Sequence, residues 1–231
     1  MHPSLLALLF LFLVALGMTT GYAATNSYEK DIVAFEASDR TNPPPANAIL
    51  FVGDSQFTRW HSLHEDLPGY RVINRGFGGS TMPDLLQYLG RIVLPYRARM
   101  IVVNEGGNDI HAGRTPEQLL ADITTFVTRV RTTQPDVPII LTGLAPSPAR
   151  WNERDIRLRF NRMLLAYASA EKNIIYLDIF NGFLGADGKP NEALFVEDKL
   201  HHSAAGYAVR VRIMRPFLGP PDFPERSPKR H

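Results

Sequence analysis

The sequence predicts an α/β protein, a three-layer α/β/α sandwich around a central five-stranded parallel sheet. The first observation is a set of short, continuous apolar runs, which are typical of strands buried on both faces. The second is that amphipathic, helix-like stretches fill the gaps between them. Regular alternation of strand and helix favours a parallel sheet covered by helices on both sides. The apolar runs occupy residues 48–53, 71–74, 100–104, 138–143 and 173–179.

Among the expected helices, the one over residues 116–133 has the clearest signals. Thr115 can act as its N-cap, Pro116 suits the first helical position and Glu117 places an acid in the first turn. The last helix is expected to stop at Gly219, which two prolines follow. The expected helices cover residues 28–39, 82–94, 116–133, 152–172 and 204–218.

The N-terminal segment differs in composition from the rest of the chain. Residues 4–16 are almost wholly apolar and small residues follow at 21–24. This pattern is typical of a secretory signal peptide over residues 1–24, cut after Ala23 or Ala24. The run is shorter than the ~20 residues of a membrane span, although an uncleaved anchor is the alternative. We therefore expect a secreted or periplasmic protein without a stable membrane anchor after cleavage.

The rest of the chain fits one folded domain. Of the 231 residues, 45% are hydrophobic and 21% charged, as in ordinary globular proteins. We expect an N-terminal helix and proline-rich spacer over residues 25–47, the domain over 48–219 and a disordered tail over 220–231. A formal net charge of +2 without a long basic run indicates no nucleic-acid partner. The absence of cysteine excludes a disulfide framework, a thiolate metal site and a cysteine nucleophile.

Small and polar residues follow the first three predicted strands, where ligands of open parallel sheets bind. The first strand runs into Gly-Asp-Ser with Ser55, the second into a Gly-Gly pair that ends at Gly79, and the third into Gly-Gly-Asn-Asp with Asn108. An Asp-x-x-His pair, Asp198 and His201, comes later. Each motif alone also fits an ordinary turn, cap or structural pair. Together they supply the parts of a nucleophilic triad and donors for an oxyanion.

The order of these motifs resembles the four sequence blocks of the SGNH (GDSL-type) hydrolases, named after a Ser, a Gly, an Asn and a His. The strings FVGDSQFTRW and VINRGFGGSTMPDLL are similar to the bacterial branch of platelet-activating-factor acetylhydrolase-like and lysophospholipase L1-like esterases. The resemblance spans about residues 48–215. It implies a flavodoxin-like SGNH hydrolase fold and a serine esterase activity that needs no cofactor.

The resemblance also implies a role for individual residues. The matching positions are the catalytic residues Ser55, Asp198 and His201 and the oxyanion-hole residues Ser55, Gly79 and Asn108. Gly78 lies one residue from Gly79 and is easily confused with it. Gln56 departs from the Leu or Ile of many members, which puts the substrate preference in doubt rather than the chemistry.

Patterns that would point to other chemistry are absent or weak. Residues 53–57 read GDSQF, so the Gly-x-Ser-x-Gly nucleophile elbow is missing, and no dinucleotide fingerprint or P-loop is present. His61 and His64 have a helical spacing that could hold a metal, but without further ligands a solvated helix face is the better interpretation. We therefore expect no metal site.

Other residues near the motifs have simpler expected roles. Trp151 lies in the loop over 145–153, after the fourth strand, and is a candidate for the substrate pocket. His202 is expected to be a neighbour of the base rather than the base. Asp54 and Asp109 are expected to hydrogen-bond loop backbone.

The implied function is hydrolysis of short-chain, acetyl-type carboxylic esters of carbohydrates or small lipids through an acyl-enzyme on Ser55. The loops over 145–153 and 182–197 leave no room for a large lid, which favours short acyl chains. Two alternatives remain open: an extracellular polysaccharide O-acyltransferase with the same residues, and a non-catalytic carbohydrate- or lipid-binding module. The expected partner is a small-molecule ester, and the sequence does not indicate an oligomeric state.

Overall fold

The structure is a computed structural model that describes residues 28–223 of the chain. Within this range it has a sheet of five parallel strands in the order β2-β1-β3-β4-β5. The predicted five-stranded parallel sheet is therefore confirmed. The strands are β1 (Ile49–Gly53), β2 (Val72–Gly76), β3 (Met100–Asn104), β4 (Ile139–Thr142) and β5 (Ile174–Leu177).

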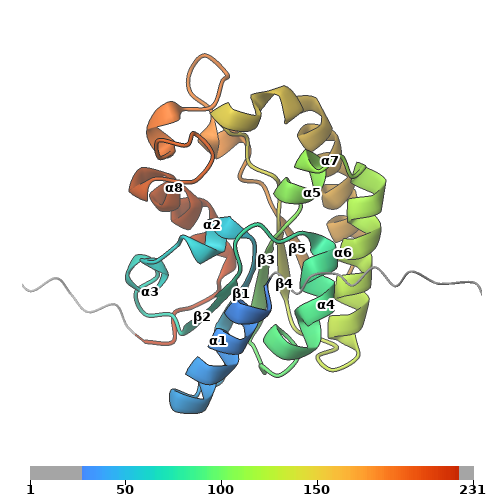
Figure 1. Cartoon of the computed structure of the whole chain (residues 1–231), viewed down its shortest axis with the longest axis vertical. Coiled ribbons are helices and arrows are strands. Elements are labelled where there is room, and N and C mark those ends of the chain that lie inside the picture. Colours follow the sequence, from blue (N-terminus) through green and yellow to red (C-terminus); the bar gives the residue numbers. More distant parts are fainter. Residues whose placement is uncertain (1–27, 224–231) are drawn as a thin grey trace, which may run out of the picture.

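Helices cover both faces of this sheet. The longer helices are α1 (Glu29–Thr41), α4 (Met82–Ile92), α6 (Pro116–Arg131), α7 (Arg154–Ala170) and α8 (Ala204–Met214). The short ones are α2 (Ser55–Thr58), α3 (Leu63–Asp66) and α5 (Gly107–His111), with 3-10 turns at η1 (Pro148–Glu153), η2 (Asn181–Phe183), η3 (Glu192–Leu194) and η4 (Arg215–Phe217). Figure 1 shows α4, α6 and α7 on one side of the sheet and α2, α3 and α8 on the other.

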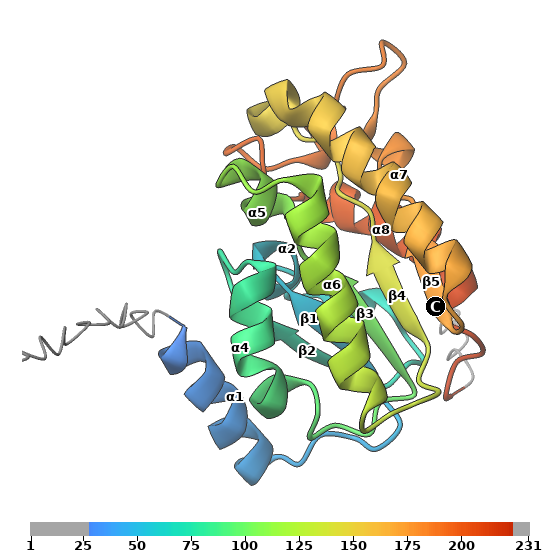
Figure 2. The ribbon, with the colours of Figure 1, turned by 90° about the vertical axis from the view of Figure 1, so that its right-hand side faces the viewer.

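The alternation of strand side chains divides the core in two. Leu50 and Val52 of β1 pack with buried residues of α1, α4, α6 and α7, and Figure 2 looks onto that layer. Ile49 and Phe51 pack with residues of α2, α3 and α8. The predicted three-layer sandwich is thus confirmed.

The register of β1 brings three strand ends together. Gly53 lies opposite Gly76 of β2 and opposite Asn104 of β3. The residues that follow these three strands therefore emerge side by side at the carboxyl edge of the sheet, where the polar motifs of the sequence were expected to meet.

The helices follow the predicted signals with shifts at their ends. The Thr115 hydroxyl accepts the Gln118 N–H at 3.2 Å, and the Gln118 side chain accepts the Thr115 N–H at 2.9 Å. This reciprocal cap confirms the predicted helix start. The stretch expected to be one helix over 152–172 differs, because η1 precedes α7 and is kinked at Arg150, with φ −126° and ψ 30°.

Residues 220–223, at the start of the segment predicted to be disordered, instead pack against residues 69–71, which lead into the edge strand β2. The Asp222 carboxylate accepts the Arg71 N–H at 2.8 Å, and the Phe223 N–H donates to the Gly69 carbonyl at 3.0 Å. The Arg71 guanidinium lies over the Phe223 ring, 4.7 Å from its centroid. These contacts give the segment partners that its composition does not reveal. The remaining residues of the predicted tail and the expected signal peptide (residues 1–24) lie outside the described range.

Candidate active site

Ser55 stands at the junction between β1 and α2. The residue before this junction must be glycine, because a Cβ at Gly53 would lie 2.1 Å from the Asn104 carbonyl oxygen of β3. Asp54 caps α2 by accepting the Gln56 N–H at 2.9 Å, as predicted for this residue. Because Ser55 is the first residue of α2, its N–H has no acceptor within the helix. The Ser55 N–H is therefore available to a ligand.

A hydrogen-bonded line connects Ser55, His201 and Asp198. His201 Nε2 lies 2.9 Å from Ser55 Oγ, and His201 Nδ1 lies 2.7 Å from Asp198 Oδ2. The other Asp198 oxygen accepts the N–H groups of Leu200 and His201 at 3.0 and 2.9 Å, so a single turn fixes acid and base together. With Nδ1 protonated toward Asp198, the lone pair of Nε2 faces the serine hydroxyl. This is the arrangement required for a general base acting on a nucleophile.

The Asp198 carboxylate is held in its ionised form. Partial burial opposes ionisation, but the hydrogen bonds from the backbone and ring of His201 and from the Leu200 N–H outweigh it, so the pKa of Asp198 is lowered well below its usual value. The Arg59 guanidinium adds a contact at 3.3 Å. Gln56 supports the same loop, because its side-chain nitrogen donates to the Leu200 carbonyl at 3.1 Å.

Asn108 lines the same cavity as Ser55, and Gly79 follows β2, whose end lies beside the end of β1. Asn108 is in α5, which begins after Gly106 in the left-handed region at φ +106°. Its side-chain amide donates one hydrogen to the Ser80 carbonyl at 2.9 Å and has a second hydrogen to offer. Gly79 has φ +87° and its carbonyl accepts the Tyr28 hydroxyl at 2.9 Å. Of the two adjacent glycines, only Gly79 has a positive φ that requires glycine.

A polar network lies buried beneath Ser55. The Asn104 side-chain amide donates to Asp54 at 3.0 Å, and its oxygen accepts bonds from Arg210 at 2.8 Å and from the Thr142 hydroxyl at 3.1 Å. Burial raises the pKa of Asp54 and lowers that of Arg210 to about 10. Through these hydrogen bonds, the turn that contains Ser55 is anchored to β3, β4 and α8. Sequence analysis missed Arg210, because one Arg within an amphipathic helix carries no signal of burial.

Two further buried carboxyl groups lie near Ser80 and Asn108. Burial, reinforced by the charge of Asp54, raises the pKa of Glu105 well above its usual value, and Glu105 pairs with the Ser80 hydroxyl. Burial also raises the pKa of Asp109 to about 6. Asp109 accepts the Met82 N–H at 3.1 Å, as predicted for a residue that binds loop backbone. The hydroxyl of Ser80 is therefore fixed by Glu105, and the carbonyl of the same residue accepts the Asn108 amide.

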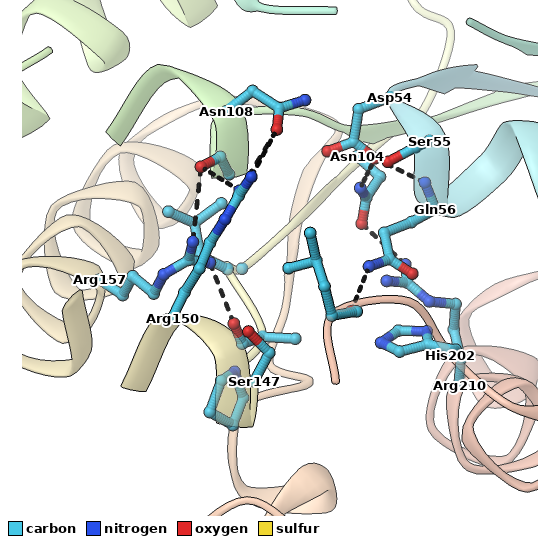
Figure 3. A pocket seen from close by; sticks show the side chains of 16 residues that line it. Asp54, Ser55, Gln56, Asn104, Asn108, Ser147, Arg150, Arg157, His202 and Arg210 are labelled. Carbon is cyan, nitrogen blue, oxygen red and sulfur yellow. Dashed lines mark hydrogen bonds between the residues drawn. The ribbon is translucent and has the colours of Figure 1, made fainter. Parts of the chain in front are cut away.

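A narrow cavity opens between Ser55 and Asn108, with about 40 Å³ accessible to the centres of water molecules (Figure 3). Its walls are both polar and apolar, and the labelled residues include Gln56, Asn108, Ser147, Arg150, His202 and Arg210. Trp151, the predicted pocket residue, lies half-buried in η1 with its ring 5.6 Å from the Arg154 guanidinium, and its neighbour Arg150 lines the cavity instead. The loop after β4 reaches the site, but sequence analysis selected the wrong side chain for this cavity.

Over residues 28–223, the histidines other than His201 have no hydrogen bond to the Ser55 hydroxyl. His202 is buried and stacks on Phe183 with ring centroids 4.3 Å apart. Burial, together with the nearby positive charge of Arg210, lowers the pKa of His202 well below its usual value, so its ring is neutral. His61 and His64 are exposed, and over residues 28–223 no group of three His, Asp or Glu side chains is placed to hold a metal ion.

Comparison with known proteins is consistent with this geometry. Residues 40–209 match the model of the GDSL-like lipase/acylhydrolase family. The chain belongs to this family. Because this is a family of lipases and acylhydrolases with esterases among its relatives, the protein is a carboxylic ester hydrolase.

Individual relatives are more distant. Esterase TesA of Pseudomonas aeruginosa PAO1 is 25% identical over 151 residues, which are 65% of this chain and 71% of TesA. A Streptococcus pneumoniae protein described as a platelet activating factor superposes with a TM-score of 0.72 at 22% identity, over 82% of this chain and 92% of the other. The acetylxylan esterase Axe2 of Geobacillus stearothermophilus gives a TM-score of 0.62 at 17% identity, over 79% and 99% of the two chains. The two structural likenesses establish the fold.

Proposed function

We propose that this protein is a secreted serine esterase that hydrolyses short-chain, acetyl-type esters of carbohydrates or small lipids through an acyl-enzyme on Ser55. The observation that carries the proposal is the Ser55–His201–Asp198 line, with contacts of 2.9 and 2.7 Å. A serine hydroxyl is a weak nucleophile unless a base removes its proton, and this geometry supplies that base and its orienting carboxylate.

The reaction then follows in two steps. Ser55 Oγ attacks the ester carbonyl while His201 Nε2 takes the hydroxyl proton, and the imidazolium returns that proton to the leaving alcohol. In the second step His201 activates a water that attacks the acyl-enzyme and releases the acid. In both steps the negative oxygen is bound by the Ser55 N–H, the Gly79 N–H and the second hydrogen of the Asn108 amide.

The size of the cavity supports a short acyl group. A water needs roughly 10–15 Å³ of space for its centre, so the ~40 Å³ beside Ser55 holds about three waters or an acyl group of a few heavy atoms. The structural likeness to the acetylxylan esterase Axe2 is in keeping with an acetyl-type substrate. The N-terminal pattern over residues 1–24 supports secretion, and over residues 28–223 no helix has both the length and the apolar character of a membrane span.

The decisive experiment compares wild type with Ser55→Ala on 4-nitrophenyl esters of increasing acyl length. We expect near-complete loss of hydrolysis in Ser55→Ala and a wild-type preference for acetyl over longer acyl groups. Retained hydrolysis in Ser55→Ala would remove the proposed nucleophile, whereas a preference for long chains would overturn the substrate class alone. Product analysis with a sugar acceptor separates transfer of the acyl group to water from transfer to the sugar.

A further inference from the structure

Arg150 binds the oxygen of the side-chain amide that the proposed mechanism uses. Both terminal nitrogens of its guanidinium donate to Asn108 Oδ1 at 3.2 Å, and Nη1 also donates to the Gly107 carbonyl at 3.0 Å (Figure 3). Over residues 28–223 no carboxylate forms an ion pair with Arg150, whereas the adjacent Arg157 pairs with Glu153 at 2.6 Å. The charge of Arg150 is therefore directed at the peptide and amide oxygens of α5.

From these contacts we propose that Arg150 is a positioning residue for the oxyanion hole, which orients and polarises the Asn108 amide. This inference rests on the proposed function, because it assigns a role within the same hydrolytic site. It goes beyond the triad and the oxyanion donors, since Arg150 acts through Asn108 and does not touch the reacting atoms.

The two anchors of Asn108 specify one orientation of its amide. The oxygen faces the donor-only guanidinium, and the nitrogen faces the acceptor-only carbonyl of Ser80 at 2.9 Å. A flipped amide would place N–H against N–H at Arg150 and oxygen against oxygen at Ser80. With both anchors present, the second N–H is held toward the side of Ser55. Without Arg150 only the Ser80 contact opposes rotation.

The positive charge of Arg150 also strengthens the Asn108 N–H as a hydrogen-bond donor. A cation bound at an amide oxygen draws electron density from the nitrogen, so the remaining N–H becomes a better hydrogen-bond donor, as in other polarised hydrogen-bond chains. The benefit grows as the substrate oxygen becomes negative. Arg150 is thus expected to stabilise the transition state more than the bound ester, which lowers the barrier of the chemical step rather than the KM.

The local fold holds Arg150 in this place. The 3-10 turn η1 departs from helical geometry at Arg150, with φ −126° and ψ 30°. The preceding residue, Ala149, donates its N–H to the Lys199 carbonyl at 3.1 Å, in the turn that carries Asp198 and His201. The loop after β4 therefore contacts the base-bearing turn with one residue and the oxyanion amide with the next.

A double-mutant cycle tests the proposal. We expect Arg150→Met to lower kcat on 4-nitrophenyl acetate about 10- to 100-fold with KM within about 2-fold, a smaller loss than the ~100- to 1,000-fold typical for removal of a whole oxyanion donor. In the Asn108→Ala background, where no amide is left to orient, Arg150→Met should change kcat by less than about 2-fold. Arg150→Lys, which keeps the charge but not the two-pronged donor, should fall between wild type and Arg150→Met.

Several controls keep the outcome unambiguous. Arg159→Gln removes an exposed arginine of α7 that pairs with Glu117 of the neighbouring helix α6, and it should leave kcat unchanged. Thermal unfolding of every variant reports whether lost activity is lost fold. Equal loss of kcat in the presence and absence of the Asn108 amide, or an effect confined to KM, would overturn the role of Arg150. Activity retained in Ser55→Ala would instead overturn the proposed function, so the two failures are distinguishable.

Discussion

Replacement of Asp198 by Asn separates the orienting role of this carboxylate from its structural role. An Asn keeps an oxygen that can accept the N–H groups of Leu200 and His201, now bonded at 3.0 and 2.9 Å. Its nitrogen, however, would face His201 Nδ1 and donate to it. The imidazole would then carry its proton on Nε2, and this N–H would point at Ser55 Oγ, where a lone pair is needed.

The structure sets the size of the expected effect. A wrong tautomer in such a triad costs up to about 10⁴-fold in kcat, and the Asp198 side chain is 40% exposed, so water can partly compensate. We expect a loss of about 1,000- to 10,000-fold, or about 4–5.5 kcal/mol in the barrier. Stability should fall by about 1 kcal/mol or less, because the backbone bonds persist and only their charge-assisted strength is lost.

The assay is steady-state hydrolysis of 4-nitrophenyl acetate together with a thermal unfolding curve for each variant. Asp187→Asn is the matched control. Asp187 also accepts a backbone N–H two residues on, from Lys189 at 3.0 Å, but it is distant from Ser55 in the sequence and is not hydrogen-bonded to it. Asp187→Asn should retain wild-type kcat. If Asp198→Asn kept kcat within 10-fold of wild type, the assignment of Asp198 as the orienting carboxylate would be wrong.

Three further predictions test other parts of the site. Asn108→Ala should lower kcat about 100- to 1,000-fold while Ser55 still reacts slowly with a serine-directed phosphonate, and an unchanged kcat would exclude the amide as an oxyanion donor. The pKa of Asp109 is raised to about 6 in the folded protein, so this carboxyl binds a proton more readily in the folded state than in the unfolded state. Its protonation therefore contributes to the stability of the fold fully below about pH 4, and this contribution is lost as the pH rises through 6. Urea unfolding should show wild type losing about 2 kcal/mol relative to Asp109→Asn between about pH 4 and pH 7.5, and parallel curves would refute this. Gly53→Ala should lose at least about 4 kcal/mol of stability because its Cβ would meet the Asn104 carbonyl at 2.1 Å. Gly90→Ala, in the last turn of α4 with open space around it, should be neutral or stabilising, and similar melting temperatures for the two variants would contradict the argument.

Sequence patterns predicted those parts of the fold in which a local rule decides the structure. Continuous apolar runs marked all five strands within three residues at each end, and the Thr115–Pro116 start of α6 was correct. Short elements carried no such pattern: α2, α3 and α5 have four or five residues, too few for a helical period to appear. The kink lies at Arg150, the residue that contacts α5, and no local sequence signal encodes that contact.

The residues of the candidate site likewise divide into those that a local motif predicts and those that only the folded structure identifies. Ser55, Gly79, Asn108, Asp198 and His201 could be selected because each lies in a short motif that follows a strand or a turn. Arg150 and Arg210 are single arginines in ordinary sequence, and their importance arises from the groups they meet across the fold. Trp151 was chosen for its size and its loop, and the structure places the adjacent arginine on the cavity instead.

The packing of residues 220–223 beside β2 has a practical meaning for the handling of this protein. The segment lies at the entry to the outer strand β2, and Asp222 also faces the Arg99 guanidinium before β3 at 3.7 Å. Asp222 occupies the backbone N–H of Arg71 just before β2, and its neighbour Phe223 is bonded to Gly69. A chain shortened to the end of the last helical turn would lose these contacts, which fix the segment that leads into β2. An affinity tag is therefore better attached beyond Phe223 than in place of the residues that precede it.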